Sequence, residues 1–274
     1  MTSPASTSGL VPLNGVQLYY ETAGGGTPFL MLHAGVADHR QWNNEFPYLA
    51  QRYRALRYDM RGYGRSQPVA GEFSHMADLL ALMDMLGLTE PAILMGCSMG
   101  GQLAMDLAIT HPERVKGLIM VGSGPKGLEL DVPDPALAEA AEEAYKAGDL
   151  DRVAELETRI WFDGEGRAPE QVDPAMRALA YEMNRNALGF GEPGKRLPDS
   201  SLPAAEHLAQ IKIPVLVIVG EHDTPFIRAA ADYMTERIPR VRKHVMRDAA
   251  HLANMDHPDE FRVVVDTYLK EHTL

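Results

Sequence analysis

The feature that most constrains the fold is the alternation of two sequence patterns along the chain. Short apolar runs, rich in β-branched and aromatic residues, cover residues 29–33, 54–58, 92–96, 115–121 and 215–220, and a more polar run covers 241–246. Helical patterns fill the intervals at about 73–87, 99–110, 226–237 and 258–271. This alternation predicts an α/β protein with a mostly parallel central sheet and helices on both faces.

An antiparallel segment precedes the parallel part. Residues 16–22 alternate between apolar and polar side chains, which is typical of a strand with one face toward solvent. Three glycines, residues 24–26, then predict a turn into the run at 29–33. We expect residues 16–22 to form an edge strand and residues 29–33 the first core strand.

The alternation breaks once, between Gly122 and about Leu208, where no strand-like run occurs and helix-like stretches are rich in Ala, Glu and Met. Residues 131–196 hold 15 acidic and 8 basic residues, more than half of the formal net charge of −12. A helical insertion between two strands predicts a cap over a site at the carboxyl edge of the sheet; a solvated helical layer without a gating role is the alternative. The predicted division is a core of residues 1–123 and 207–274 and a helical cap of residues 124–206.

Composition limits the partners. The 274 residues include one cysteine, which cannot form an intramolecular disulfide, and the first nine residues have no secretory signal pattern. These features predict a cytoplasmic protein. No apolar run reaches the roughly 18 to 20 residues that span a bilayer, and a net charge of −12 repels phosphate backbones and anionic lipids. We expect neither a nucleic-acid nor a membrane partner, and the oligomeric state stays open.

The strongest local motif is the G-x-S-x-G sequence of residues 96–100. It follows the apolar run at 92–95 and opens the helical pattern at 99–110, so the predicted context is a strand, a tight turn and a helix. Such a turn strains the backbone of Ser98 and lifts its hydroxyl above the sheet edge, and the small residues at 96 and 100 leave room for the crowded backbone. Ser98 is therefore the candidate nucleophile.

A serine hydroxyl needs a base, and the base needs an acid that holds its tautomer. On a strand–turn–helix elbow of this kind the expected chain order is serine, acid, histidine. Asp223 follows the run at 215–220 and His251 follows the run at 241–246, so both are expected in loops at the same edge as Ser98. We predict Asp223 as the acid and His251 as the base.

Other residues compete for these roles. Asp248 lies in the same predicted loop as His251 and is the strongest alternative acid. Glu221 and His222 are nearer the strand end and favour a structural role, and His257 precedes a proline, which is typical of a helix start.

Stabilisation of an oxyanion needs two backbone amides. Met99 supplies one at the start of the predicted helix, and Gly35, in the loop after the run at 29–33, is the predicted second donor because glycine permits close approach. A plain strand-to-helix turn at Gly35 is the alternative reading.

Five motifs occur in order along the chain: residues 33–35 with Trp42, residues 59–66, the elbow at Ser98, residues 220–223, and His251. Over nearly its full length the chain resembles the α/β-hydrolase superfamily, and in particular its capped esterase, enol-lactonase and haloperoxidase-like branch. The resemblance implies an α/β-hydrolase fold and the roles predicted above. Ala34 departs from the glycine that is usual in the family, which bears on the shape of the oxyanion loop.

Several further signals are weaker. Residues 122–127 fit G-x-G-x-x-G, but Pro125 interrupts the loop and no helical pattern follows, so a dinucleotide site is not expected. Cys97 has no second cysteine nearby and favours a small buried thiol. The ten histidines show no metal-binding spacing, so neither a metal nor another cofactor is predicted.

Aromatic residues are the candidates for a substrate pocket. Trp161 and Tyr181, with Phe162 and Met183, either line an apolar pocket above Ser98 or form the core of the cap itself, and Trp42 in the oxyanion segment is a further candidate.

Together these features predict a serine hydrolase that cleaves a carboxylic ester or lactone of a small molecule through an acyl-enzyme intermediate. The alternatives are a carbon–carbon bond hydrolase or a perhydrolase or haloperoxidase-like enzyme on the same residues, because the nucleophile does not define the leaving group. A small-molecule receptor that retains the fold is a third possibility.

Overall fold

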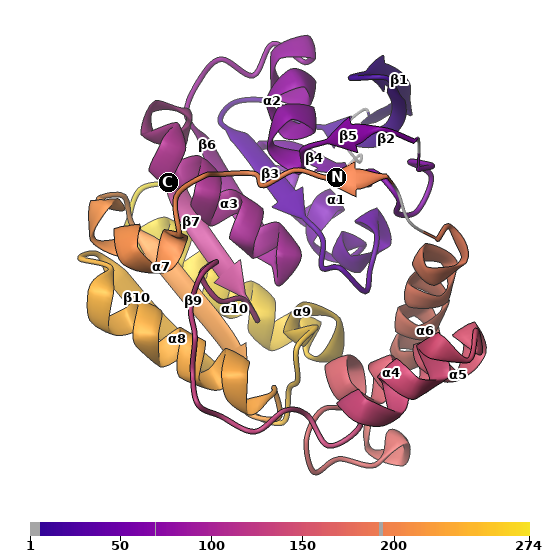
Figure 1. Cartoon of the computed structure of the whole chain (residues 1–274). Coiled ribbons are helices and arrows are strands. Elements are labelled where there is room, and N and C mark those ends of the chain that lie inside the picture. Colours follow the sequence, from indigo (N-terminus) through magenta and orange to yellow (C-terminus); the bar gives the residue numbers. More distant parts are fainter. Residues whose placement is uncertain (1–5, 69, 192–193) are drawn as a thin grey trace.

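The structure, a computed structural model, describes residues 6–68, 70–191 and 194–274. Eight strands form one sheet in the order β1-β2-β4-β3-β6-β7-β9-β10 (Figure 1). The strands are β1 (Ser6–Leu13), β2 (Val16–Ala23), β3 (Pro28–Leu32), β4 (Arg54–Tyr58), β6 (Ala92–Cys97), β7 (Val115–Val121), β9 (Val215–Gly220) and β10 (Val241–Met246). In this sheet, the six strands β4, β3, β6, β7, β9 and β10 are parallel, whereas β1 and β2 run antiparallel to their neighbours. The predicted α/β class with a mostly parallel sheet is confirmed.

The strand side chains belong to two separate hydrophobic cores, one on each face of the sheet. Phe29 and Met31 of β3 belong to one cluster, and Leu30 and Leu32 belong to the other. Successive side chains of a strand point to opposite faces, so a strand that is covered on both faces must be apolar at every position. This is the physical reason for the continuous apolar runs in the sequence.

Helices cover both faces. The cluster that contains Phe29 includes residues of α1 (Glu45–Leu49) and α10 (Pro258–Glu271), and the opposite cluster includes residues of α2 (His75–Met85), α3 (Met99–Thr110) and α8 (Pro225–Arg237). The short helices α7 (Ala204–His207) and α9 (Ala253–Asp256) complete the layers. The predicted helices at 99–110 and 258–271 have these bounds in the structure, and His257 directly precedes the helix that Pro258 begins, as the sequence indicates.

The prediction that residues 16–22 form an edge strand is wrong. Strand β1 occupies the edge, and β2 lies inside it, paired with β1 and β4. Residues 6–9 read Ser-Thr-Ser-Gly and are largely exposed, so an edge strand here carries no apolar run that would reveal it.

Between β7 and β9 lie α4 (Ala138–Lys146), α5 (Leu150–Thr158), a π-helical turn (Arg159–Asp163) and α6 (Pro174–Gly189). Figure 1 shows these helices grouped beside the sheet, toward the ends of β7 and β9. A small apolar cluster of its own, Ala141, Ala144, Val153 and Leu156, joins α4 to α5. We call residues 124–206 the helical insertion.

The insertion also contains a strand, contrary to the sequence prediction. The two residues of β8 (Lys195–Arg196) pair in parallel with β5 (Glu72–Phe73). Two residues are too few for any periodicity to predict, and the pairing depends on a partner more than 120 positions away. Among the described helices, none is long and apolar enough to cross a membrane.

Candidate active site

Ser98 occupies the turn between β6 and α3. Its backbone angles are φ 49° and ψ −113°, a conformation that costs a non-glycine residue about 1–3 kcal/mol. A Cβ atom on Gly96 would lie 2.4 Å from the Gly100 oxygen, and one on Gly100 would lie 2.2 Å from the Leu32 oxygen. Only glycine fits at either position, as the sequence predicts, and the crowding holds the serine in its strained turn.

His251 and Asp223 form a buried pair. The Nδ1 atom of His251 lies 3.0 Å from each carboxylate oxygen of Asp223, and the two residues are 2% and 0% exposed. Asp223 follows β9, and the Thr224 amide donates to its Oδ1 at 2.7 Å. A carboxylate at this position holds the imidazole in the tautomer whose Nε2 can accept a proton.

The competing acid and histidines lie elsewhere. The Asp248 side chain is 82% exposed, and its Oδ1 lies 3.9 Å from His222 Nε2, while the Asp248 backbone oxygen lies 3.2 Å from His257 Nε2. His222 Nδ1 lies 2.6 Å from the backbone oxygen of Glu165 in the insertion. In the part of the chain that the structure describes, none of these residues makes a hydrogen bond or ion pair with the His251 ring.

The end of β7 brings Ser98 and the buried pair together. The Ser98 amide donates to Val121 O at 2.9 Å, and the Ser123 hydroxyl donates to Ser98 O at 2.8 Å. A Cβ on Gly122, between them, would lie 3.0 Å from His251 Nδ1 and 3.2 Å from Asp223 Oδ2. The first glycine of the G-x-G-x-x-G sequence is therefore explained by its contact with His251 and Asp223, without a dinucleotide.

Two backbone segments meet at the predicted oxyanion site. A Cβ on Gly35 would lie 3.8 Å from Met99 Cβ, so the loop after β3 directly faces the first turn of α3. The Ala34 amide donates to Gln41 Oε1 at 2.9 Å, and the Met60 amide donates to His33 Nε2 at 2.9 Å. The loop that carries Gly35 is thus held on both sides by buried hydrogen bonds.

Sequence reasoning missed a buried polar network behind this loop. Gln41 Nε2 donates to Asn254 Oδ1 at 3.2 Å, and Asn254 Nδ2 donates to Gln41 O at 2.8 Å and to Glu45 Oε2 at 3.2 Å. Burial raises the pKa of Glu45 to about 8, although its bond from Asn254 opposes the shift. The network links the oxyanion loop to the helix that follows His251. Gln41 and Glu45 lie among other polar residues in the sequence, so no local signal indicates the network.

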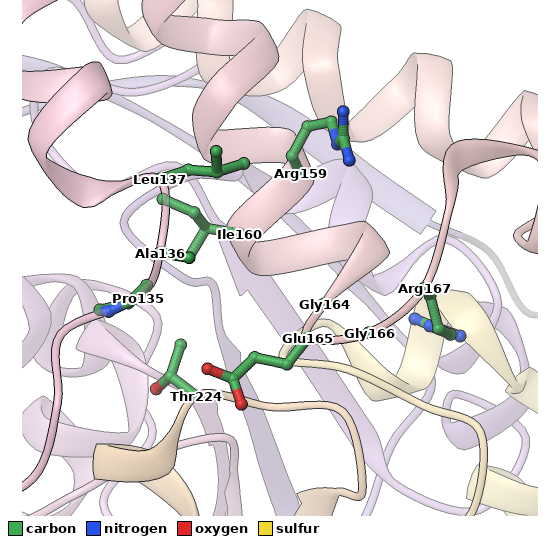
Figure 2. Close-up of a pocket in the computed structure, with 10 residues that line it drawn as sticks. All are labelled: Pro135, Ala136, Leu137, Arg159, Ile160, Gly164, Glu165, Gly166, Arg167 and Thr224. Carbon is green, nitrogen blue, oxygen red and sulfur yellow. The ribbon is translucent and has the colours of Figure 1, made fainter.

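Two cavities flank the site at the seam between core and insertion. Figure 2 shows the larger, of about 450 Å³, beside the acid loop. It is lined by residues 135–137, Arg159, Ile160, residues 164–167 and Thr224. The other, of about 200 Å³, lies on the oxyanion side; its lining includes Gly35, Tyr63, Glu157 and Asn184. Sites of this kind suit small molecules.

The three predicted pocket residues have different positions. Trp161, in the π-helical turn, lies with its ring centroid 4.6 Å from that of His251 and lines a small cavity beside Glu157. Trp42 is fully buried and packs against Phe261 in the core, so its prediction as a pocket residue is not supported. Tyr181 is half-buried on α6 and lines none of the cavities described above. Phe162 and Met183 are buried and join the main core.

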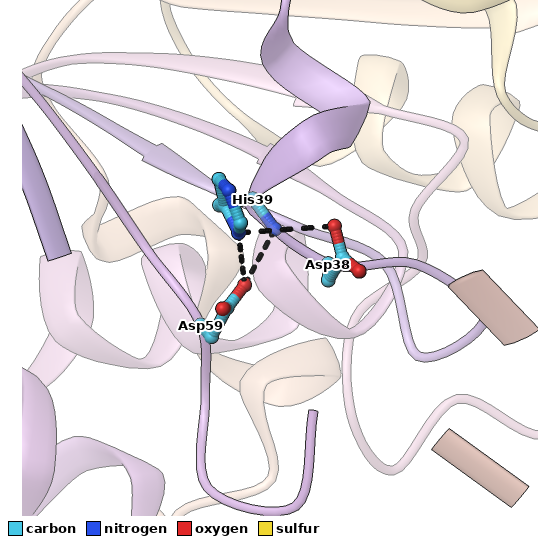
Figure 3. Close-up of side chains that lie close together, drawn as sticks. All are labelled: Asp38, His39 and Asp59. Carbon is cyan, nitrogen blue, oxygen red and sulfur yellow. Dashed lines mark hydrogen bonds and ion pairs between the residues drawn. The ribbon is translucent and has the colours of Figure 1, made fainter. Parts of the chain in front are cut away.

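A buried cluster of Asp38, His39 and Asp59 has the composition of a metal site (Figure 3). Asp59 Oδ1 accepts hydrogen bonds from the backbone amide and ring Nδ1 of His39, each at 2.7 Å, and its Oδ2 accepts from the Arg65 amide at 2.8 Å. Asp38 pairs with Arg40 at 2.8 Å. Because protein groups already occupy these oxygens, the cluster braces the loop of residues 59–66.

Cys97, next to the nucleophile position, is fully buried, and burial raises the pKa of its thiol to about 12. A thiol in this environment stays protonated at neutral pH and is a poor nucleophile. This agrees with the buried role that the sequence favours.

Comparison with known proteins places this geometry in a family. Residues 27–258 match the family model described as alpha/beta hydrolase fold. The chain is 29% identical over 252 residues to pimeloyl-[acyl-carrier protein] methyl ester esterase from Aeromonas hydrophila subsp. hydrophila, covering 91% of this chain and 98% of that protein. It is 29% identical over 235 residues to 3-oxoadipate enol-lactonase 1 from Acinetobacter baylyi, covering 85% of each. A thermophilic esterase from Thermogutta terrifontis superposes with a TM-score of 0.75 at 25% identity, covering 97% of this chain and 99% of that one.

The matched family model spans the elbow, the acid loop, the histidine loop and the whole insertion between them. The parallel strands of the sheet, the strained serine and the buried Asp223–His251 pair thus occur together within one matched segment. The chain belongs to the α/β-hydrolase family.

Proposed function

We propose that this protein is a serine hydrolase that cleaves a carboxylic ester or lactone of a small molecule through an acyl-enzyme intermediate. The observation that carries the proposal is the convergence of a strained Ser98 and a buried Asp223–His251 pair on residues 121–123 at the end of β7. A strained serine is retained at a cost of about 1–3 kcal/mol, which a purely structural turn does not require.

In the proposed reaction the Ser98 hydroxyl attacks the carbonyl carbon while His251 Nε2 takes its proton. The amides of Gly35 and Met99 donate to the oxyanion of the tetrahedral intermediate. The intermediate collapses, the bond to the alkoxy oxygen breaks, and His251 gives its proton to the leaving alcohol. Water then attacks the acyl-enzyme by the same steps and releases the acid and free Ser98. Asp223 orients the imidazole and stabilises its charged form throughout.

We further propose that the helical insertion of residues 124–206 acts as the cap of the site. Support comes from Trp161, whose ring lies against His251, and from the cavities that the insertion shares with the core. A cap in this position excludes water from the carbonyl and shapes the space for the acyl and alcohol groups.

The direct test labels the wild-type protein and Ser98→Ala with a small fluorophosphonate and measures intact mass. We expect one adduct in the wild type and none in the variant. p-Nitrophenyl esters of increasing chain length then measure turnover, which we expect to fall in Ser98→Ala by about 10⁴ to 10⁶ in kcat. Retained turnover in pure Ser98→Ala would overturn the mechanism.

The same experiment separates the alternatives. An adduct without ester turnover would favour a carbon–carbon hydrolase or a receptor, because the activated serine would be present without ester specificity. Peroxide-dependent oxidation in place of hydrolysis would favour a perhydrolase. Ester or lactone turnover at ordinary enzyme rates, about 1 to 1000 per second, would make these alternatives unnecessary.

A further inference from the structure

One acidic side chain of the insertion faces the site and takes no part in the proposed reaction. Glu157 lies near the end of α5 and is half-buried. Asn184 of α6, 3% exposed, donates from Nδ2 to Glu157 Oε2 at 2.8 Å. Both residues line the cavity of about 200 Å³ whose wall also includes Gly35 and Tyr63.

This cavity adjoins the loop that carries the proposed oxyanion donor Gly35. Gly35 belongs to the oxyanion loop, and the Tyr63 hydroxyl lies 3.7 Å from Met99 Sδ, on the first residue of α3. Glu157 also lines the small neighbouring cavity with Trp161, which lies against His251. An ester whose carbonyl lies at Ser98 and whose end enters this cavity therefore extends toward Glu157 and Asn184.

Neighbouring acids of the insertion are neutralised, whereas Glu157 is not. Arg177 contacts both Glu155, at 2.7 Å, and Asp163, at 2.9 Å. Among the residues that the structure describes, the polar partner of Glu157 is the neutral Asn184, and no Lys or Arg lines the cavity. Burial raises the pKa of Glu157, and the hydrogen bond from Asn184 opposes the shift.

The unused hydrogen-bonding capacity of the pair consists mainly of acceptors. Among the described residues, the hydrogen bond of the pair uses Glu157 Oε2 and Asn184 Nδ2, which leaves the second carboxylate oxygen, the amide oxygen and one N–H for a ligand. A hydroxyl or ammonium group can donate to these oxygens, whereas a carboxylate would meet a partly desolvated negative charge with no cation among the described lining residues.

We propose that Glu157 and Asn184 form a specificity subsite that selects substrates carrying a hydroxyl or ammonium group at the end remote from the scissile bond and rejects those that end in a carboxylate. The inference rests on the proposed function, since it assumes an ester or lactone at Ser98. The inference specifies the polarity of the remote end of the substrate, which the Asp223–His251 pair does not define.

A purely structural role would be to hold α5 against α6. Other contacts already do so, because Arg177 of α6 contacts Glu155 of α5, and Arg185 of α6 pairs with Asp151 of α5 at 2.5 Å. If the pair were purely structural, substitution of Glu157 would lower the stability of the protein without changing its ranking of substrates. Substrate preference is therefore the readout that separates the two roles.

The test uses esters of equal length that end in methyl, hydroxyl, dimethylammonium or carboxylate. One series varies the acyl group of p-nitrophenyl esters, and the other varies the alcohol group of acetate esters, so that either end of the substrate can enter the cavity. We expect the wild type, in at least one series, to prefer the hydroxyl and ammonium ends over the carboxylate end by about 10-fold or more in kcat/KM.

In Glu157→Gln, the kcat/KM ratio of the carboxylate ester to the methyl ester should rise about 10-fold, and the ammonium-to-methyl ratio should fall by a similar factor. Glu157→Met is a second variant that removes the charge with little change in size. Asp151→Asn is the matched control, since it makes the same charge change on an exposed part of α5 and should leave every ratio as in the wild type.

The outcomes distinguish this inference from the proposed function. If the wild type neither reacts with the fluorophosphonate nor turns over the methyl esters, both the proposed function and the subsite are overturned. Labelling and methyl-ester turnover with unchanged ratios in folded Glu157→Gln and Glu157→Met, in both series, would overturn the subsite alone. Equal changes in Asp151→Asn would show a general charge effect and would also overturn it.

Discussion

Ser98, Asp223 and His251 come from three different turns, and the contact of His251 with its acid depends on a single buried residue. The Asp223 carboxylate is fully buried and directed at His251, whereas Asp248, three residues from that histidine, points to solvent. The Asp248 backbone has φ 56°, in the left-handed region that few non-glycine residues adopt.

This difference predicts a strong asymmetry between two equivalent substitutions. Asp223→Asn should lower kcat by about 10⁴, because the amide favours the wrong imidazole tautomer and cannot stabilise the charged ring. Asp248→Asn, the matched control, should stay close to the wild type because its side chain is exposed and makes no hydrogen bond to the His251 ring among the described residues. Steady-state kinetics on one p-nitrophenyl ester measure both, and the reverse ranking would place the acid on the other residue.

Glu45 predicts how stability depends on pH. Its pKa is about 8 in the folded protein against an ordinary value of 4.5, so the folded state keeps a proton that the unfolded state loses. The free energy of unfolding should therefore fall as pH rises from about 5 to 8, by up to about 5 kcal/mol from this group. Glu45→Gln should flatten that slope in urea titrations across this range.

The exposed Glu90 provides the control for this prediction. Glu90→Gln makes the same charge change at the surface and should retain the wild-type slope. An unchanged slope in folded Glu45→Gln would mean that other groups account for the pH dependence of stability.

At the scale of elements, α5, the π-helical turn and α6 are joined by one arginine. Arg177 of α6 contacts Glu155 of α5 and the fully buried Asp163 at the end of the turn. Arg159 is farther from Asp163, at 3.8 Å. The turn also holds Trp161 against His251, so this ion pair supports the surface that faces the site.

Removal of the ion pair between Arg177 and Asp163 should make the helical insertion unfold locally under conditions in which the core stays folded. Arg177→Met leaves a buried carboxylate with only a distant cation, a loss that typically costs about 3–5 kcal/mol. We expect earlier proteolytic cleavage near residues 159–167 and a lower melting temperature. Arg185→Met, whose partner Asp151 is exposed, is the matched control and should resist cleavage like the wild type. Equal cleavage of both variants would contradict this role for Arg177.

At the scale of the whole molecule, the net charge of −12 acts on every charged substrate that approaches. This long-range term is screened by salt, since the Debye length falls from about 30 Å at 0.01 M to about 8 Å at 0.15 M. It is distinct from the local effect of Glu157, which is partly shielded from the solvent ions.

Salt should therefore favour anionic substrates selectively. Between about 0.01 and 0.15 M NaCl, kcat/KM for a carboxylate-terminated ester should rise by about two- to fivefold, and the methyl-terminated ester should show no change. A parallel change in both esters would indicate an effect of salt on the enzyme itself and would contradict steering by net charge.

Much of the fold is visible in the sequence because the signals are local. Continuous apolar runs define strands such as β9, and period-3.6 patterns define helices such as α3, from neighbouring residues alone. The elbow is equally local, since Gly96 and Gly100 are required by backbone contacts within and next to the same turn. The order of Ser98, Asp223 and His251 could be predicted because each follows a strand, and parallel strands end at one edge.

Contacts between distant segments were decided by the tertiary structure. Gln41 and Asn254 are 213 positions apart, and nothing in either neighbourhood indicates that they share hydrogen bonds. Trp42 and Trp161 are both aromatic residues in polar surroundings, yet one lies in the core and the other against His251. Local pattern determines which residues form a strand or a helix, whereas the path of the whole chain determines which side chains meet, and the pairing of Glu157 with Asn184 belongs to the second kind.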